Sequence, residues 1–286
     1  MTAPLLSVRD AVVEFDGPRP ANVFARRPRI QALRSVSVQI APGETVGLVG
    51  ESGSGKSTLA KAILGIVPLA GGEISWNGAP VRTARDVRHA ASRHAQLVFQ
   101  DPYSSLNPMM TVRDALVEVL KTRAGRDTAS ARAGAAELLD AVHLPRTALD
   151  RYPSEFSGGQ RQRIVIARAI AARPALLVCD EPLSALDVTT QARMIELLDQ
   201  LRRDLGMAML FIGHDLSVVR RLSDRMLVMY GGEVVEQGDS ADVIDRPANP
   251  YTRRLIASIP VADPAVQRAR RAERIAAAGT TEMESR

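Results

Sequence analysis

The sequence has 286 residues, of which 45% are hydrophobic, 24% are charged and only 3% are aromatic. This composition excludes a disordered or fibrous chain and allows a buried core built from aliphatic side chains. Because Cys179 is the single cysteine, no intrachain disulfide can form, and the net charge of +5 raises the question of an anionic partner.

The positive charge is concentrated in two stretches, 19–29 and 268–274, which we interpret as a solvated loop and a solvated tail. We therefore expect no nucleic-acid partner. No apolar run reaches the ~20 residues that a membrane-spanning helix needs. Residues 1–10 also lack the basic and apolar regions of a signal peptide. These features predict a cytoplasmic protein that reaches a membrane only through a partner.

The first hundred residues contain several predicted strands and one helix. Alternating and β-branched residues predict strands at 6–15, 32–40, 45–49 and 96–99, with a hairpin over 72–81 that turns at Asn77-Gly78. A glycine-rich turn follows strand 45–49 and leads into a predicted helix over 56–64.

The rest of the chain alternates helices with short apolar strands. Helices are predicted at 111–121, 129–141, 159–171 and 188–204, strands at 175–179 and 207–212, and a second hairpin over 226–236. The first two helices resemble an inserted lobe, and the alternation predicts a parallel sheet flanked by helices. After Asp239 the chain changes character and is punctuated by prolines.

The turn after strand 45–49 fits the pattern G-x-x-x-x-G-K-[ST]. It reads Gly50-Glu51-Ser52-Gly53-Ser54-Gly55-Lys56-Ser57, followed by Thr58. Glycines let the backbone wrap a phosphate, the helix N-terminus is electropositive, Lys56 can reach the β- and γ-phosphates, and Ser57 can ligate Mg²⁺. A simple Gly-Ser turn capping a helix would not need Lys-Ser at this offset.

Polar residues follow three other apolar strands. Asp180 and Glu181 end strand 175–179, Gln100 follows strand 96–99, and His214 follows strand 207–212. In open α/β sheets, ligands bind at the carboxyl ends of strands. We assign Asp180 to Mg²⁺ and Glu181 to the attacking water, although paired acids can also cap a helix. Gln100 and His214 are predicted γ-phosphate contacts.

Ser157-Gly158-Gly159-Gln160 has the form of a helix capping box, S-x-x-Q. A capping box leaves the two glycines unexplained, because glycine weakens a helix start. A phosphate approached by Ser157 and the Gly159 amide would account for them.

Taken together, these motifs resemble the nucleotide-binding subunit of ABC transporters, over residues 5–260. The motifs of that family occur in order: the phosphate loop at 50–57, the Q-loop glutamine Gln100, the signature 157–160, the Walker B strand at 176–181, the D-loop at 184–187 and the switch histidine His214. Phe156 replaces the leucine that usually opens the signature, a change we expect to be harmless.

The resemblance implies an α/β fold: a RecA-like P-loop NTPase core with a parallel sheet, an N-terminal antiparallel β subdomain and an inserted α-helical subdomain at about 101–160. It divides the chain into an ATPase domain, 1–240, and a C-terminal extension, 241–286.

The resemblance also implies roles for single residues, with ATP and Mg²⁺ as cofactors. Lys56, Gln100, Glu181 and His214 would be catalytic, and Ser57, Gln100 and Asp180 would hold the metal. The nucleotide would also contact residues 50–58, Ser157, Gly158, Gly159, Gln160 and Asp187. Because a signature closes over the ATP of another copy, the active form would be a dimer. Phe15 would stack on adenine, with Phe24 in reserve, although either can be an ordinary core or loop residue.

Two further stretches resemble dipeptide and oligopeptide importers, namely 100–108 and 249–255 together with Ile259-Pro260 and Asp263-Pro264. The same subfamily includes nickel and glutathione importers, which stay open as alternatives. The expected partners are a second ATPase subunit, identical or related, two permease subunits and, through these, an extracytoplasmic solute-binding protein. This places the chain peripherally on the cytoplasmic face of the inner membrane. A non-transport ABC ATPase and a nucleotide-binding scaffold without hydrolysis are the rival interpretations.

Overall fold

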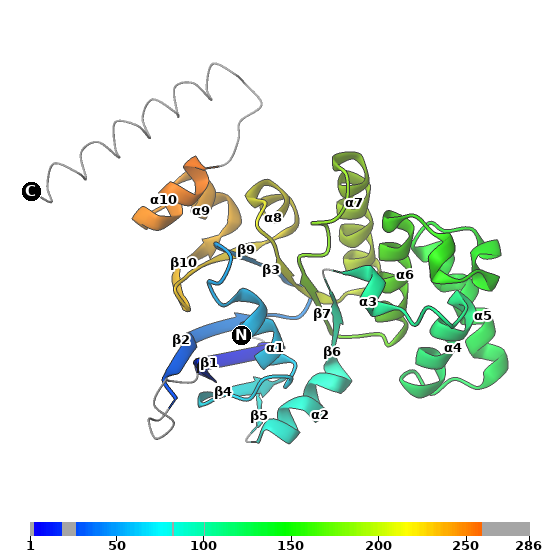
Figure 1. Ribbon diagram of the computed structural model, residues 1–286, viewed down its shortest axis with the longest axis horizontal. Coiled ribbons are helices and arrows are strands. Elements are labelled where there is room, and N and C mark those ends of the chain that lie inside the picture. The colour runs from blue at the N-terminus through cyan, green and yellow to red at the C-terminus, as the bar shows by residue number, and fades with distance from the viewer. Residues whose placement is uncertain (1–2, 19–26, 82, 100, 259–286) are drawn as a thin grey trace, which may run out of the picture.

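The computed structural model describes residues 3–18, 27–81, 83–99 and 101–258 (Figure 1). Its centre is a six-stranded sheet whose strands are parallel except for β10 at one edge. The order across this sheet is β10 (Glu233–Asp239), β9 (Arg225–Tyr230), β3 (Thr45–Val49), β8 (Ala208–Ile212), β7 (Leu176–Asp180) and β6 (Ala95–Val98). The predicted parallel sheet and the hairpin at its edge are confirmed.

A second, antiparallel sheet lies at the N-terminal side of the molecule, drawn in blue and cyan in Figure 1. Its order is β2 (Arg29–Ile40), β1 (Leu6–Asp16), β4 (Gly71–Trp76) and β5 (Ala79–Val81). The turn between β4 and β5 is the predicted Asn77-Gly78 hairpin, and both residues have the positive φ angles that such a turn requires.

Helices surround the central sheet, and one group forms a separate lobe, drawn in green in Figure 1. The lobe contains α3 (Pro102–Ser105), α4 (Val112–Thr122), α5 (Thr128–Ala141), the 3₁₀ turns η1 (Arg146–Asp150) and η2 (Pro153–Glu155), and α6 (Gly158–Ala171). The other helices are α1 (Lys56–Ile63), α2 (Ala84–His94), α7 (Val188–Leu205), α8 (Leu216–Leu222), α9 (Ser240–Asp245) and α10 (Pro250–Ala257).

Helices α2, α3, α8 and α9 were not predicted from the sequence. Helix α2 buries only Val87 and Ala91, so its apolar stripe is too thin to produce a clear helical period. Helix α8 has only seven residues, two turns, which is too short for a periodic pattern.

Two apolar clusters pack on opposite faces of the central sheet. Residues alternate between them along each strand: Leu177 and Cys179 of β7 face the cluster shared with the helical lobe, while Leu176 and Val178 face the cluster shared with the antiparallel sheet. Burial on both faces explains why β3, β7 and β8 are almost uninterrupted apolar runs.

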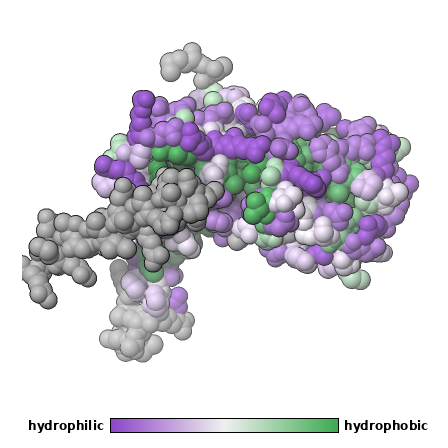
Figure 2. All heavy atoms as spheres, turned by 90° about the horizontal axis from the view of Figure 1, so that it is seen from above, coloured by the Kyte–Doolittle hydropathy of each residue, from purple (hydrophilic) through white to green (hydrophobic). Residues whose placement is uncertain are grey.

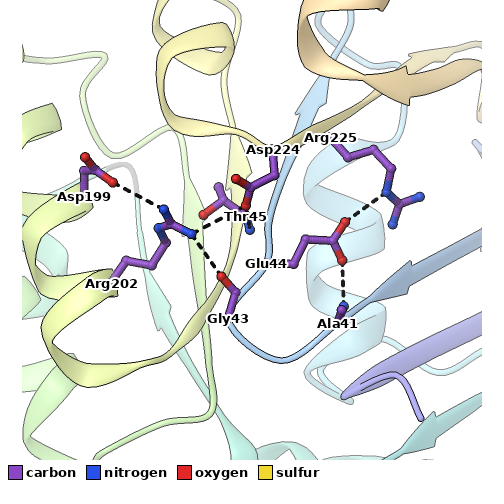
Figure 3. A network of polar contacts seen from close by, with 8 residues as sticks. All are labelled: Ala41, Gly43, Glu44, Thr45, Asp199, Arg202, Asp224 and Arg225. Carbon is purple, nitrogen blue, oxygen red and sulfur yellow. Dashed lines mark hydrogen bonds and ion pairs between the residues drawn. The ribbon is translucent and has the colours of Figure 1, made fainter. Parts of the chain in front are cut away.

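A polar network fixes the start of β3 between α7 and β9 (Figure 3). The Thr45 N–H donates to Asp224 Oδ2 at 2.7 Å, and Arg202 of α7 donates to the Gly43 carbonyl at 3.0 Å. Beside them, Arg225 of β9 pairs with Glu44 at 2.9 Å. These contacts fix the start of β3 against α7 and β9. Since β3 is a short strand, they also fix the position of its carboxyl end relative to the neighbouring strands.

Over the described ranges, we find no helix that combines the length and the apolar character needed to cross a bilayer. The face seen in Figure 2 is largely hydrophilic where it is coloured, with apolar residues in separate small patches.

We predict that Gly47→Ala destabilises the fold. A Cβ at position 47 of β3 would lie 2.3 Å from Val219 Cγ1 and 2.5 Å from Ser223 Oγ, so these two side chains would have to move. Overpacking of this kind costs about 1–3 kcal/mol of unfolding free energy, measurable by urea denaturation. The control is Gly71→Ala, whose Cβ would meet Val12 at an ordinary 3.6 Å. Equal stabilities of the two variants would contradict this packing.

Candidate functional site

The phosphate loop joins β3 to α1 in the predicted place. Gly50, Gly53 and Gly55 have φ angles of +150°, +80° and +104°, which residues other than glycine rarely adopt. At Gly50 a Cβ would also lie 2.2 Å from the Met229 carbonyl oxygen. Helix α1 begins after Gly55, which offers no side-chain cap. The backbone N–H groups of its first turn therefore lack a capping side chain and are free to donate hydrogen bonds to a bound anion.

Lys56 is buried beneath this loop, with a side chain that curls back onto the backbone. Its Nζ donates to the carbonyls of Gly50 and Glu51, both at 2.8 Å. Burial lowers the pKa of Lys56, and the charges of Glu181, Asp180 and Glu51 oppose this shift. The ammonium group is thus held at the centre of the loop by weak backbone dipoles and nearby carboxylates.

Ser57 and Asp180 meet although they lie 123 positions apart. The Ser57 hydroxyl donates to Asp180 Oδ1 at 3.0 Å. Burial raises the pKa of Asp180, the Ser57 hydrogen bond opposes the rise, and the charge of Glu181 adds to it. A partly buried carboxylate beside a hydroxyl is the type of oxygen pair that a hard divalent cation prefers.

No group of three His, Cys, Asp or Glu side chains suited to a metal occurs within the described ranges. Magnesium is usually held by one or two carboxylates together with substrate phosphates and water. Ser57 and Asp180 therefore fit a Mg²⁺ ion that arrives with a nucleotide, rather than a closed metal cage of protein ligands.

Glu181 stands at the end of β7 with a strained backbone. Its φ is +48°, unusual for a residue with a side chain, and its N–H donates to the Ile212 carbonyl of β8 at 3.0 Å. Its carboxylate lies 3.7 Å from Nδ1 of His214, which follows β8. Strain at such a residue is typical of functional sites. Here it accompanies a carboxylate placed beside an exposed imidazole.

Two of the residues predicted to contact nucleotide cannot be placed. Gln100 and Phe24 lie outside the described residues. Phe15 lies near the end of β1, opposite Ile30 of β2, and is 43% exposed. Its stacking on adenine stays a prediction.

The signature residues form the N-terminus of α6 in the helical lobe. The predicted capping box is confirmed: the Gln160 N–H donates to Ser157 Oγ, and the Ser157 N–H donates to Gln160 Oε1. Throughout the described part of the chain, no hydrogen bond joins residues 157–160 to residues 50–58.

The two signature glycines differ in their surroundings. A Cβ at Gly159 would lie 2.6 Å from Thr190 Cγ2 on α7, whereas a Cβ at Gly158 would meet nothing closer than 4.0 Å. Helix packing therefore already excludes a side chain at Gly159, while the approach of a phosphate to the two glycines stays a prediction.

Asp187 of the D-loop caps α7. Its carboxylate accepts hydrogen bonds from the Thr190 N–H at 3.0 Å and from the Thr190 hydroxyl at 2.7 Å, and these bonds lower the pKa of Asp187. A role in nucleotide binding is not visible in this contact and stays a prediction.

One contact of the phosphate loop was missed. The N–H of Glu51 donates at 3.1 Å to the hydroxyl of Tyr251, which lies on α10 near the end of the described chain. The sequence analysis noted Tyr251 only as part of a C-terminal motif. No local pattern could have indicated a contact across 200 positions.

Two family models match the sequence. The model described as "ABC transporter" matches residues 33–184, and "Oligopeptide/dipeptide transporter, C-terminal region" matches residues 235–284. Among curated proteins, the glutathione import ATP-binding proteins GsiA of Escherichia coli (strain K12) and of Shigella flexneri are 46% identical over 270 residues. The match covers 94% of this chain but spans only 43% of the length of these relatives.

Solved structures agree with this similarity. The ATP-binding cassette MJ0796, described as a dimer in a post-hydrolysis state bound to ADP and Pi, aligns with a TM-score of 0.71 at 27% identity and covers 82% of this chain and 98% of its own. The cbiO1 protein of Clostridium perfringens aligns with a TM-score of 0.72 at 23% identity, over 85% of this chain and 92% of its own, which is a likeness of fold.

We predict that Asp180→Asn stabilises the nucleotide-free protein increasingly as pH rises from about 4. Because the pKa of Asp180 is raised in the folded state, this group binds protons more strongly there than in the unfolded state, so the contribution of Asp180 to stability falls as pH increases through this range. Asparagine keeps the acceptor for Ser57 but removes the titration. Urea unfolding between pH 4 and pH 7 measures the difference.

Asp187→Asn is the matched control, because the pKa of Asp187 is lowered and its substitution should reverse the sign of the pH dependence. A stability difference between Asp180→Asn and wild type that is constant with pH would contradict a raised pKa of the Asp180 carboxyl.

Proposed function

Because this chain belongs to the ABC transporter family, we propose that it is the ATP-binding and ATP-hydrolysing subunit of an ABC importer for dipeptides, oligopeptides or related solutes. The proposal depends most on one observation: the phosphate loop, Asp180 and Glu181, and His214 follow β3, β7 and β8 at the same edge of the sheet.

In this proposal the triphosphate lies along the phosphate loop. The amides at the start of α1 and the Lys56 ammonium bind the β- and γ-phosphates, and Ser57, Asp180 and Gln100 hold Mg²⁺. The metal ion, when bound, would neutralise charge on the phosphate oxygens. Among the described residues, Lys56 donates to the Gly50 and Glu51 carbonyls and to Ser54, and its ammonium can exchange those partners for phosphate oxygens.

Glu181 orients and deprotonates the water that attacks the γ-phosphate. His214, 3.7 Å from the Glu181 carboxylate, contacts the γ-phosphate and holds the carboxylate in place. The strained backbone at Glu181 directs its side chain from the end of β7 toward this position.

A second ATPase subunit, identical or related, completes the site. Ser157, Gly158, Gly159 and Gln160 lie at the N-terminus of α6 in the helical lobe, where their amides can face the nucleotide of a partner. The description of MJ0796 as a dimer supports this arrangement. Asp187 of the D-loop and Phe15 would contribute at the interface and at the adenine ring.

The permease subunits would dock in a groove between the central sheet and the helical lobe. This groove has a volume of about 610 Å³ and is lined by residues of α2, β6, α3, α4 and α6, with the exposed apolar side chains of Ile66 and Phe99 at its edge. Such a groove suits a short helix of a membrane protein. The chain would then lie on the cytoplasmic face of the inner membrane.

The cargo is proposed to be a peptide or a peptide-like solute. The match of residues 235–284 to the oligopeptide and dipeptide transporter family supports a peptide, and the name of the GsiA relatives supports glutathione, itself a modified tripeptide. Nickel is the remaining alternative. Uptake assays of the assembled transporter with a labelled dipeptide, glutathione and nickel would distinguish these cargoes.

We predict that Glu181→Gln retains ATP binding but slows hydrolysis by at least ~100-fold, because the amide cannot accept a proton from water. Nucleotide affinity and phosphate release measure the two effects. The control is Glu196→Gln on α7, where the exposed carboxylate pairs with Arg221 on the surface. Rapid hydrolysis by Glu181→Gln would remove Glu181 from its assigned role, and a wild-type protein that binds no ATP would refute the proposed function.

We also predict that Ile66→Glu weakens permease binding and leaves ATP affinity unchanged, because it replaces an exposed apolar side chain at the edge of the groove by a charge. The measurement is recovery of permease subunits with the tagged chain from detergent-solubilised membranes. Leu205→Glu is the control, since Leu205 at the end of α7 is 49% exposed, as compared with 50% for Ile66. Equal recovery with both variants would exclude this groove as the docking site.

A further inference from the structure

The C-terminal helix α10 reaches the phosphate loop through one side chain. Tyr251, the second residue of α10, is only 5% exposed, and its hydroxyl accepts the hydrogen bond from the Glu51 N–H at 3.1 Å. Glu51 is the second residue of the loop, directly after β3. An element from the end of the described chain therefore contacts the backbone that is expected to wrap the phosphates.

This hydrogen bond is part of a larger support under the loop. The loop turns against the end of β9 at Gly50, and the Gly232 N–H, from the turn between β9 and β10, donates to the Ser54 carbonyl at 3.1 Å. Tyr230, the last residue of β9, packs its ring on that of Tyr251 with centroids 4.4 Å apart. Tyr251 thus fills the space between the loop and the β9 end.

Helix α10 is itself firmly attached to β10. Asn249 caps the helix by accepting the Tyr251 N–H at 2.8 Å, and its side-chain amide donates to the Val235 carbonyl at 3.1 Å. The Glu236 carboxylate accepts the N–H groups of Ala248 at 2.7 Å and Asn249 at 3.1 Å. Burial opposes ionisation of Glu236, but the hydrogen bonds it accepts prevail and lower its pKa.

The hydroxyl distinguishes Tyr251 from an ordinary core residue. Its ring belongs to the apolar cluster under α8 and α9, a place that phenylalanine would fill equally well. Burial raises the pKa of Tyr251, and the Glu51 hydrogen bond opposes the rise. The hydroxyl therefore stays neutral near pH 7. It can accept the hydrogen bond from the loop amide without adding a negative charge beside a phosphate site.

We propose that Tyr251 is a positioning residue for the nucleotide: its hydroxyl holds the first turn of the phosphate loop in the binding conformation before the nucleotide arrives. The proposal rests on the proposed function. A loop that is already ordered loses less conformational entropy when it binds its ligand, so its affinity is higher. The extension would thereby tune nucleotide affinity from the far end of the chain.

The test is Tyr251→Phe in the full chain, which removes one oxygen atom and keeps the ring. We expect the dissociation constants for MgATP and ADP, and the KM for ATP, to rise about five-fold, as for the loss of one hydrogen bond. The kcat at saturating ATP should stay within about two-fold, because the groups proposed for hydrolysis are unchanged. Tyr230→Phe is the control, since it removes a neighbouring hydroxyl from the same ring pair.

Hydrogen exchange of the loop provides a second readout that does not depend on hydrolysis. The Glu51 amide should exchange faster in nucleotide-free Tyr251→Phe than in wild type, while amides of the central strands should be unaffected. Unchanged affinity and unchanged exchange would overturn the proposal, as would equal losses of affinity in both tyrosine variants. A wild-type chain that binds no nucleotide would instead refute the proposed function, so the two failures are distinguishable.

Discussion

The parallel register of β3, β8 and β7 is the constraint on which the site depends. Ile212 of β8 pairs with Leu48 on one side and with Asp180 on the other, so the three strands end at nearly the same level. The residues that continue each strand are therefore neighbours. Without this register the Ser57 hydroxyl could not reach Asp180, nor Glu181 approach His214.

The site contains partly buried charged groups that a charged ligand would stabilise. Burial lowers the pKa of Lys56 and raises that of Asp180, so each group is held where its charged form is disfavoured by desolvation. A polyphosphate complements the ammonium group and a divalent cation complements the carboxylate. The free energy lost in burying these two charges can then be recovered on binding Mg²⁺ and ATP together.

The C-terminal region of the described chain contacts the phosphate loop. Residues 235–284 match a family model of their own; within the described chain, Asn249 at the start of α10 donates to the Val235 carbonyl of β10, and Tyr251 of α10 contacts the phosphate loop. The curated relatives are more than twice as long as the matched segment. The hydrogen bond from the Glu51 N–H to the Tyr251 hydroxyl links this C-terminal region directly to the phosphate loop.

The sequence alone was sufficient for those parts of the site that lie on continuous stretches of chain. The glycine-rich turn into α1, the position of the acids at the end of β7 and the capping box at Ser157 were each predicted correctly as local structure, because backbone conformation and local spacing determine them. Helices α2, α3, α8 and α9 were not predicted, since α2 buries too little apolar surface and the other three are too short for a helical period. The contacts of Glu51 with Tyr251, of Gly159 with Thr190 and of Thr45 with Asp224 were decided only by the tertiary structure. Each joins elements whose proximity depends on strand order and helix packing, and these are properties of the whole core that no local window of sequence contains.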